Sequence, residues 1–227
     1  MDVSDIRCVP WKERKIPKRV SRFQGNFLLC LGRRSRDVVL AAVALLVLWP
    51  FFIIISVAIV ADSPGAGPIF SQTRVGKDGK CFTMYKFRTM IPNAEAQLEE
   101  LLAGNEMDGP AFKIRRDPRI TRLGYFLRRS SIDELPQLWN VLRGEMSLVG
   151  PRPALPREVA MYDDRTRLRL KVRPGITGLW QISPARNRVP FEQRLKMDLQ
   201  YIREGDFGMD WKILLATFGT VLQMQGE

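Results

Sequence analysis

The sequence contains no histidine. This absence excludes Ser-His-Asp triads, Cys-His pairs and metal sites built on imidazole. Cysteine is scarce as well: Cys8, Cys30 and Cys81 lie far apart and show no CxxC spacing, so we expect free thiols in a reducing compartment. Any enzymatic chemistry must therefore rest on carboxylates, lysine, arginine, hydroxyl groups or a metal held by oxygen.

Charge, in contrast, is abundant and unbalanced. The 227 residues include 36 Lys and Arg against 24 Asp and Glu, which gives a formal net charge of +12. Such a surface favours an anionic partner, which could be nucleic acid, acidic lipid headgroups or a phosphorylated substrate. Residues 1–37 are polar and basic with interleaved aromatics, and we interpret them as a membrane-proximal lead.

One hydrophobic segment indicates a membrane. Val38–Ala61 contains 24 residues without a charge, enough for a helix to cross the apolar core of a bilayer. Pro50 lies near its middle, where proline removes a helix hydrogen bond and clashes with the preceding turn. Two alternatives follow: a kinked transmembrane helix, or a re-entrant helix that breaks at Pro50 and returns to the side it entered.

Residues 62–227 are predicted to form one α+β domain of mostly amphipathic helices with a small antiparallel β-hairpin. The Asp78–Gly79 pair between two β-favouring runs predicts strands at Ile69–Val75 and Cys81–Phe87. Apolar residues at helical spacing predict helices at about 94–103, 117–128, 191–203 and 211–222.

An acidic pair, Asp133–Glu134, opens the densest polar cluster of the chain. Ser131 and Glu134 have the spacing of a capping box, and Pro136 is tolerated only in the first turn of a helix, so a helix should begin close to Asp133 and stop at Gly144. The two carboxylates could then serve as caps that complement the helix dipole, or they could perform chemistry.

Three basic turns favour the chemical alternative. They contain Lys86 and Arg88, Arg152 between two prolines, and Lys171 with Arg173. Arginine matches the geometry of phosphate, and lysine acts on it as a point charge. A carboxylate can attack phosphorus when Mg²⁺ and cations neutralise the phosphate oxygens, and Mg²⁺ accepts one or two carboxylates together with phosphate oxygens and water. The acidic pair and the basic turns together therefore suit phosphate chemistry, with Mg²⁺ held at Asp133 and Glu134.

The same residues resemble the signature blocks of the bacterial sugar transferases, also called monotopic phosphoglycosyl transferases. The blocks are KFRTM at Lys86–Met90, DELPQLWNVLRGEMSLVGPRP at Asp133–Pro153 and VRPGITGLWQI at Val172–Ile182. The resemblance implies that Asp133 attacks the β-phosphate of a UDP-sugar, releases UMP, and passes the sugar phosphate to polyprenyl (undecaprenyl) phosphate, with Glu134 assisting. It also implies a re-entrant membrane helix. The substrate-binding candidates are Lys86, Arg88, Arg152, Arg173 and, from the family pattern, Asp198.

These expectations describe an enzyme that initiates exopolysaccharide or glycoconjugate assembly at the bacterial inner membrane. Because UDP-sugars are cytoplasmic, its domain at 62–227 should face the cytoplasm. Arg33, Arg34 and Arg36 place the other flank there too by the positive-inside rule, which favours the re-entrant alternative. Membrane lipids are expected partners and nucleic acid is not. The alternatives are a catalytically inactive scaffold of a polysaccharide-assembly complex and a membrane-anchored nucleic-acid-binding protein, although no RNA-binding signature or zinc finger is recognisable.

Overall fold

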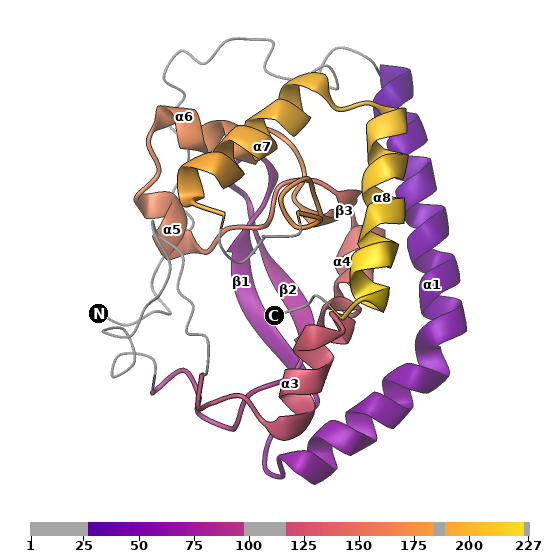
Figure 1. The fold of residues 1–227 in the computed structure, drawn as a ribbon, viewed down its shortest axis with the longest axis vertical. Helices are drawn as coiled ribbons and strands as arrows, with labels where there is room; N and C mark the ends of the chain where they lie inside the picture. Colours follow the sequence, from indigo (N-terminus) through magenta and orange to yellow (C-terminus); the bar gives the residue numbers. More distant parts are fainter. Residues whose placement is uncertain (1–26, 98–116, 184–188, 225–227) are drawn as a thin grey trace.

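The computed structural model describes residues 27–97, 117–183 and 189–224. A long helix, α1 (Phe27–Asp62), precedes a hairpin of β1 (Ile69–Val75) and β2 (Cys81–Phe87). The following elements are α3 (Arg122–Arg129), α4 (Gln137–Arg143), β3 (Ser147–Val149), α5 (Pro156–Ala160), α6 (Asp164–Arg167), β4 (Gly175–Thr177), α7 (Phe191–Glu204) and α8 (Phe207–Leu222). Figure 1 shows the hairpin near the centre, with α1 along one side of the molecule and α8 beside the first half of α1.

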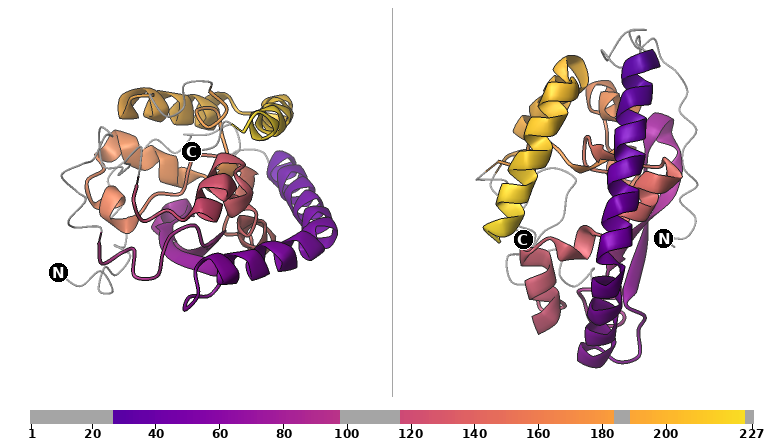
Figure 2. Two further views of the ribbon diagram at one scale, coloured as in Figure 1. Left: turned by 60° about the horizontal axis from the view of Figure 1, so that its bottom comes forward. Right: turned by 90° about the vertical axis from the view of Figure 1, so that its right-hand side faces the viewer.

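Helix α1 is continuous through Pro50, so the predicted break is not confirmed. The helix also begins earlier than the uncharged segment, because the arginine-rich stretch before Val38 is helical too. Figures 1 and 2 show that α1 bends in its second half, and a proline inside a helix is a usual cause of such a bend. Its mean hydropathy reaches 3.0, so α1 is long and apolar enough to cross a membrane by length and composition.

The outer side of α1 is apolar and uncovered by the described domain. From Val39 onward its exposed large side chains are Val39, Val43, Leu46, Val47, Trp49, Phe51, Ile53, Ile54, Val57 and Val60. Helix α8 exposes a second apolar stripe of Trp211, Leu215, Phe218 and Leu222. Continuous apolar surface of this kind marks contact with a membrane or another protein, and the composition of α1 favours the membrane.

The predicted hairpin is confirmed at both strands. Its antiparallel register pairs Ile69 with Phe87 and Val75 with Cys81. The connecting turn holds Asp78 at φ 55° and Gly79 at φ 77°, a left-handed conformation that Asp and Gly tolerate better than other residues.

Three predicted helices start at other residues than expected. Helix α3 begins at Arg122 rather than near Asp117, because the Thr121 side chain accepts a hydrogen bond from Gly124 N at 2.9 Å and caps it there. Helix α8 begins at Phe207 because Asp206 caps it through Met209 N. The third helix, α4, begins at Gln137.

Before α4 the chain forms a 3₁₀ turn, η5 (Ile132–Glu134). Ser131 has φ 56° and its side chain makes no capping hydrogen bond, so the predicted capping box is wrong. The predicted stop at Gly144 is confirmed, since that residue has the left-handed φ of 80° that ends helices.

Helix α7 confirms the predicted helix at 191–203. The predicted helix at 94–103 lies mostly outside the described residues, and residues 94–97 form turns.

A short parallel pair, β3 with β4, was not predicted. It pairs Ser147 with Gly175 and Val149 with Thr177. A Cβ atom on Gly175 would lie 2.0 Å from Gly150 N, so glycine alone permits this approach of the two backbones. The pair therefore sets the Arg152 loop against the Arg173 turn.

The buried core lies between the hairpin, α4, β3 and the inner sides of α1 and α8. Its main cluster includes Ala41, Met84, Val141, Met146 and Ile213. A second cluster joins Ile59 of α1 to Phe87 and Leu127, with Phe52, Ile55, Ile132 and Leu135 packed against it. Both halves of α1 thus contribute to the core of the domain.

The cysteine expectation holds in part. Cys30 is a free, exposed thiol, whereas Cys81 is disulfide-bonded, so the expectation of a free thiol is wrong there. Spacing along the chain excludes a CxxC pair but does not determine which cysteines meet in space.

Candidate active site

The acidic pair lies on the 3₁₀ turn η5 because of the apolar residues on either side of it. Residues three apart share one face of a 3₁₀ helix. Ile132 and Leu135 have this spacing, and both pack into the cluster around Ile59 and Phe87. Asp133 and Glu134 are left between these two anchors. Asp133 is buried and Glu134 is partly exposed.

Lys86 connects the hairpin to this acidic pair. Its Nζ donates a hydrogen bond to Glu134 Oε1 at 2.8 Å and lies 3.5 Å from Asp133 Oδ2. One lysine therefore neutralises part of the charge of two adjacent carboxylates. The structure brings together three of the residues selected from the sequence, Asp133, Glu134 and Lys86.

Asn140, which the sequence analysis did not select, fixes the position of Lys86. Its side chain is fully buried; Nδ2 donates to Thr83 O and to Glu145 Oε2 at 2.7 Å each, and Oδ1 accepts from Tyr85 N at 3.2 Å. The amide thus holds α4 against the edge of β2, one residue before Lys86. The only sequence signal was a polar residue at a core-facing position of α4.

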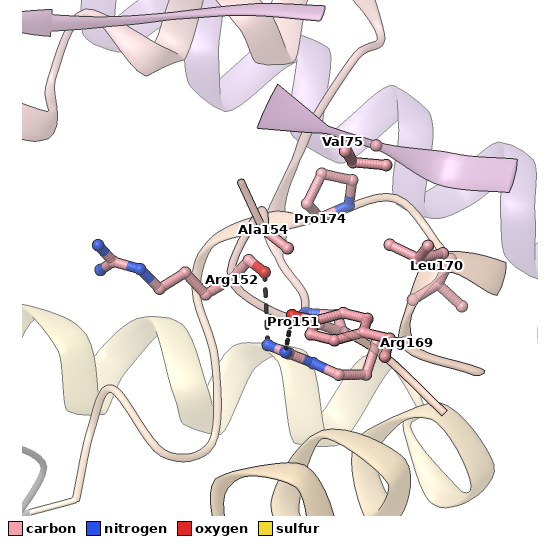
Figure 3. Close-up of a pocket in the computed structure, with 10 residues that line it drawn as sticks. Val75, Pro151, Arg152, Ala154, Arg169, Leu170 and Pro174 are labelled. Atoms are coloured by element: carbon pink, nitrogen blue, oxygen red, sulfur yellow. Dashed lines mark hydrogen bonds between the residues drawn. The ribbon is translucent and has the colours of Figure 1, made fainter. Parts of the chain in front are cut away.

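Arg88 and Arg152 take part in backbone contacts of two loops. Arg88 Nε donates to Gly67 O at 2.7 Å and ties the end of β2 to the loop after α1. The exposed Arg152 side chain points away from a small hollow lined by Val75, Arg169 and Leu170 among others (Figure 3). Its carbonyl oxygen accepts from Arg169 Nη2 at 3.5 Å.

Asp198 is buried in α7, away from the acidic pair. It forms an ion pair with Arg169 at 2.8 Å between Nε and Oδ2. Arg169 in turn donates to Tyr162 OH at 2.9 Å and to the carbonyl of Arg152 (Figure 3). Asp198 therefore orients the arginine that supports the Arg152 loop.

Arg173 lies at the opposite end of α4 from the acidic pair. It is exposed and its Nε donates to Gly144 O at 2.9 Å. Arg34 donates to the neighbouring carbonyls of Val141 and Leu142. These two arginines complement the negative C-terminal end of α4.

The arginines at the start of α1 bind carboxylates of the domain. Arg33 and Arg36 both donate to Asp210 of α8, the latter at 2.7 Å, and Asp210 is fully buried. Tyr201 OH donates to Asp210 as well, at 2.9 Å.

Burial, and then the negative charge of Asp210, raise the pKa of the Tyr201 phenol. The raised pKa keeps the phenol a neutral donor, although nearby Arg33 acts on the pKa in the opposite direction. Asp37 completes the network by accepting from Arg36 and from Ser147 Oγ.

Arg74 is a further cation that the sequence analysis did not select. It lies on β1, is 7% exposed, and donates to Pro153 O at 3.1 Å and Gln72 Oε1 at 2.7 Å. Burial lowers the pKa of its guanidinium to about 10, and the charge of Arg152 acts in the same direction.

The carboxylates of the acidic pair could hold Mg²⁺ only together with ligands from water and substrate. Within the described residues no group of three or more His, Cys, Asp or Glu side chains could hold a metal ion. Asp133 and Glu134 offer two carboxylates, and Mg²⁺ completes such a partial shell with water and phosphate oxygens. The pair therefore fits a magnesium ion that a phosphorylated substrate helps to hold.

Comparison with known proteins gives matches over nearly the whole chain. The model of a family described as bacterial sugar transferase matches residues 29–224. The galactosyl transferase CpsE of Streptococcus agalactiae serotype III (strain NEM316) is 42% identical over 216 residues, which cover 90% of this chain and 48% of that protein.

Two other relatives show the same level of identity. The exopolysaccharide production protein ExoY of Rhizobium meliloti (strain 1021) is 41% identical over 201 residues, which cover 87% of this chain and 88% of that protein. The UDP-glucose:undecaprenyl-phosphate glucose-1-phosphate transferase of Escherichia coli (strain K12) is 41% identical over 194 residues, which cover 82% of this chain and 39% of that protein. The chain thus spans less than half the length of CpsE and of the E. coli protein, and most of the length of ExoY.

Proposed function

Since this chain belongs to the bacterial sugar transferase family, we propose that it transfers a sugar 1-phosphate from a UDP-sugar to polyprenyl phosphate and releases UMP. The observation that supports this most directly is the contact of Lys86 with both Asp133 and Glu134 in a chain without histidine. Two relatives have names that specify a UDP-sugar donor: a UDP-galactose-lipid carrier transferase of Erwinia amylovora and the E. coli glucose-1-phosphate transferase. The name of the E. coli protein also specifies undecaprenyl phosphate as the acceptor.

The proposed first step forms a covalent bond to the protein. A carboxylate oxygen of Asp133 attacks the β-phosphorus of the UDP-sugar, and the bond from that phosphorus to the bridging oxygen breaks, so UMP leaves with the electron pair. Lys86 holds the two carboxylates together and places positive charge beside the reacting phosphate. Because Asp133 is buried, little water is available to hydrolyse the aspartyl intermediate.

The second step regenerates the carboxylate. A phosphate oxygen of the polyprenyl carrier attacks the same phosphorus, the bond to Asp133 breaks, and the product is a polyprenyl diphosphate sugar. Asp133 and Glu134 would hold Mg²⁺, which when bound neutralises phosphate oxygens. Glu134 keeps its hydrogen bond to Lys86 and so fixes the lysine in place.

The reaction predicts two separable half-reactions. With a UDP-sugar and Mg²⁺ but no lipid acceptor, the protein should release one equivalent of UMP and gain one sugar-phosphate mass on a peptide containing Asp133. Adding polyprenyl phosphate should then make UMP release catalytic. The relatives' names include both galactose and glucose, so UDP-galactose and UDP-glucose head the panel of donors to be screened by UMP assay and peptide mass spectrometry.

The outcomes of this assay discriminate among the alternatives. UMP release that needs the lipid but forms no adduct would replace the covalent route with direct attack by the lipid phosphate. No UMP release from any UDP-sugar would contradict the transferase proposal and favour a scaffold or a nucleic-acid-binding role.

We further propose that α1 is re-entrant in the bacterial inner membrane and that the domain faces the cytoplasm. Its first half is bound through Arg33 and Arg36 to Asp210, and its second half packs through Ile59 on Phe87 and Leu127. Both halves therefore contact one domain, which cannot lie on two sides of a bilayer. At 1.5 Å per residue the helix is about 54 Å long, well beyond the roughly 30 Å of an apolar bilayer core. The bend of α1, which Figure 2 shows, would keep both contacts on one side of the bilayer while the apolar outer face enters the lipid.

Thiol accessibility checks this topology. In a variant without Cys8, Cys30 and Cys81, single cysteines at Ser4 and Ser71 should both resist an impermeant thiol reagent in intact cells. Both should label after the cells are permeabilised, which serves as the control for reactivity. Labelling of position 4 but not 71 in intact cells would mean that α1 crosses the membrane.

A further inference from the structure

Arg74 is a buried cation whose hydrogen-bond acceptors among the described residues are both neutral. Its two hydrogen-bond acceptors are the Pro153 carbonyl and the Gln72 side-chain amide. Its Nε is buried and has no acceptor among the residues that the structure describes. Buried charges in proteins are normally paired, because removing an ion from water without a counter-charge is costly.

The carboxylates that act on the charge of Arg74 also have other partners. Glu158 and Glu134 act on its charge favourably, while Arg152 and Arg157 oppose it. Glu158 Oε2 accepts from Leu155 N at 2.9 Å, and Glu134 Oε1 accepts from Lys86. Counting Arg74 itself, three arginines against two glutamates leave an excess of positive charge around Arg74.

The hairpin register places Arg74 on the face that also presents Lys86. Phe70 pairs with Lys86, and paired residues share a face, as do alternate residues along one strand. Arg74, Gln72 and Lys86 therefore lie on one side of the sheet. At one end of this row Lys86 contacts the acidic pair, and at the other Arg74 contacts the loop that contains Arg152.

Resting on the function proposed above, we propose that Arg74 is a substrate-binding residue whose guanidinium binds a phosphate oxygen of the UDP-sugar diphosphate. An anion there supplies the negative charge that the region lacks, and the unused Nε–H supplies a charge-assisted hydrogen bond. Arg88 and Arg173, which the sequence suggested for this role, already use their Nε–H groups on the backbone carbonyls of Gly67 and Gly144.

The test measures binding of UDP, a non-reacting probe, to the full chain in detergent with Mg²⁺. Arg74→Met keeps an apolar stem and removes the charge. It should raise the Kd for UDP about tenfold to a hundredfold, the range for a hydrogen bond to a charged group. The KM for the UDP-sugar should rise by a similar factor, while the KM for polyprenyl phosphate stays unchanged. Arg74→Lys should give an intermediate Kd and covers the case in which Arg74→Met does not fold.

Arg157→Gln is the matched control, because Arg157 is an exposed arginine whose charge also acts on Arg74. Its Kd for UDP should stay within about twofold of the wild type, since exposed charges are screened. A folded Arg74→Met protein with a lowered melting temperature and an unchanged Kd for UDP would contradict the proposal. It would show that Arg74 only stabilises the fold through its hydrogen bond to Pro153 O. If Arg74 controls UDP binding but the wild type never releases UMP, the anion contact stands and the transferase proposal fails.

Discussion

Replacing Asp133 with asparagine should abolish turnover while leaving the fold intact. Asparagine keeps the size of the side chain in its buried position but has no anionic oxygen to attack phosphorus. Loss of the nucleophile in covalent catalysis removes several orders of magnitude in rate, so kcat should fall by roughly a thousandfold or more. The same variant should form no sugar-phosphate adduct. UMP release and intact-protein mass spectrometry measure the two effects.

Asp164→Asn is the control for this experiment, because it removes one carboxylate from an exposed position of α6. Its turnover should equal that of the wild type. Peptide mass spectrometry must show that the asparagine at position 133 has not deamidated back to aspartate. Under that condition, an Asp133→Asn protein with more than a tenth of native turnover would show that Asp133 is not the nucleophile.

Replacing Asp210 with alanine should destabilise the protein more than any surface change. Asp210 is fully buried and accepts from Arg33, Arg36 and Tyr201. Its removal leaves two arginine side chains in the network without their shared counter-charge. Breaking a buried ion pair from one side costs about 3–5 kcal/mol. For a domain of this size that corresponds to a fall in Tm of roughly 6–20 °C.

Glu192→Ala provides a matched control. Glu192 pairs with Arg165 at 2.6 Å, a distance close to those of the Asp210 network, but both side chains are about half exposed. Exposed pairs contribute only about 0–1 kcal/mol, so the Tm of this variant should stay within a few degrees of the wild type. Equal melting temperatures for the two variants in the same detergent would show that the Asp210 network does not hold α1 to the domain.

Local signals in the sequence were sufficient for several elements. The hairpin was predicted at both strands because β-favouring runs flank an Asp–Gly turn, which needs no information from distant residues. Helix α7 was predicted for a similar reason, since its apolar residues recur at helical spacing. The start of α4 was not, because tertiary packing of Ile132 and Leu135 favours a 3₁₀ turn over the capping box that the local sequence suggests.

In the candidate site, too, local motifs were predictable and contacts between distant residues were not. Asp133, Glu134 and Lys86 were selected from their motifs, and the structure places them in contact. Arg74 and Asn140 were missed because their significance lies in burial and in partners from other elements. The contacts of Arg33 and Arg36 with Asp210 join residues 177 and 174 positions apart, which no local pattern reports. The parallel pairing of β3 with β4 escaped prediction for the same reason.

The contribution of α1 to the hydrophobic core limits how the protein can be divided. Ala41 and Ile59 are buried among residues of the domain, in different clusters. A water-soluble fragment that begins after Asp62 would expose the inner surfaces of both clusters and would leave Asp210 without the positive charge of Arg33 and Arg36. A generic single-span anchor fused in place of α1 would restore attachment to the bilayer but not those surfaces. Helix α1 and the rest of the described domain therefore form one folding unit, unlike proteins whose membrane anchor is an exchangeable module.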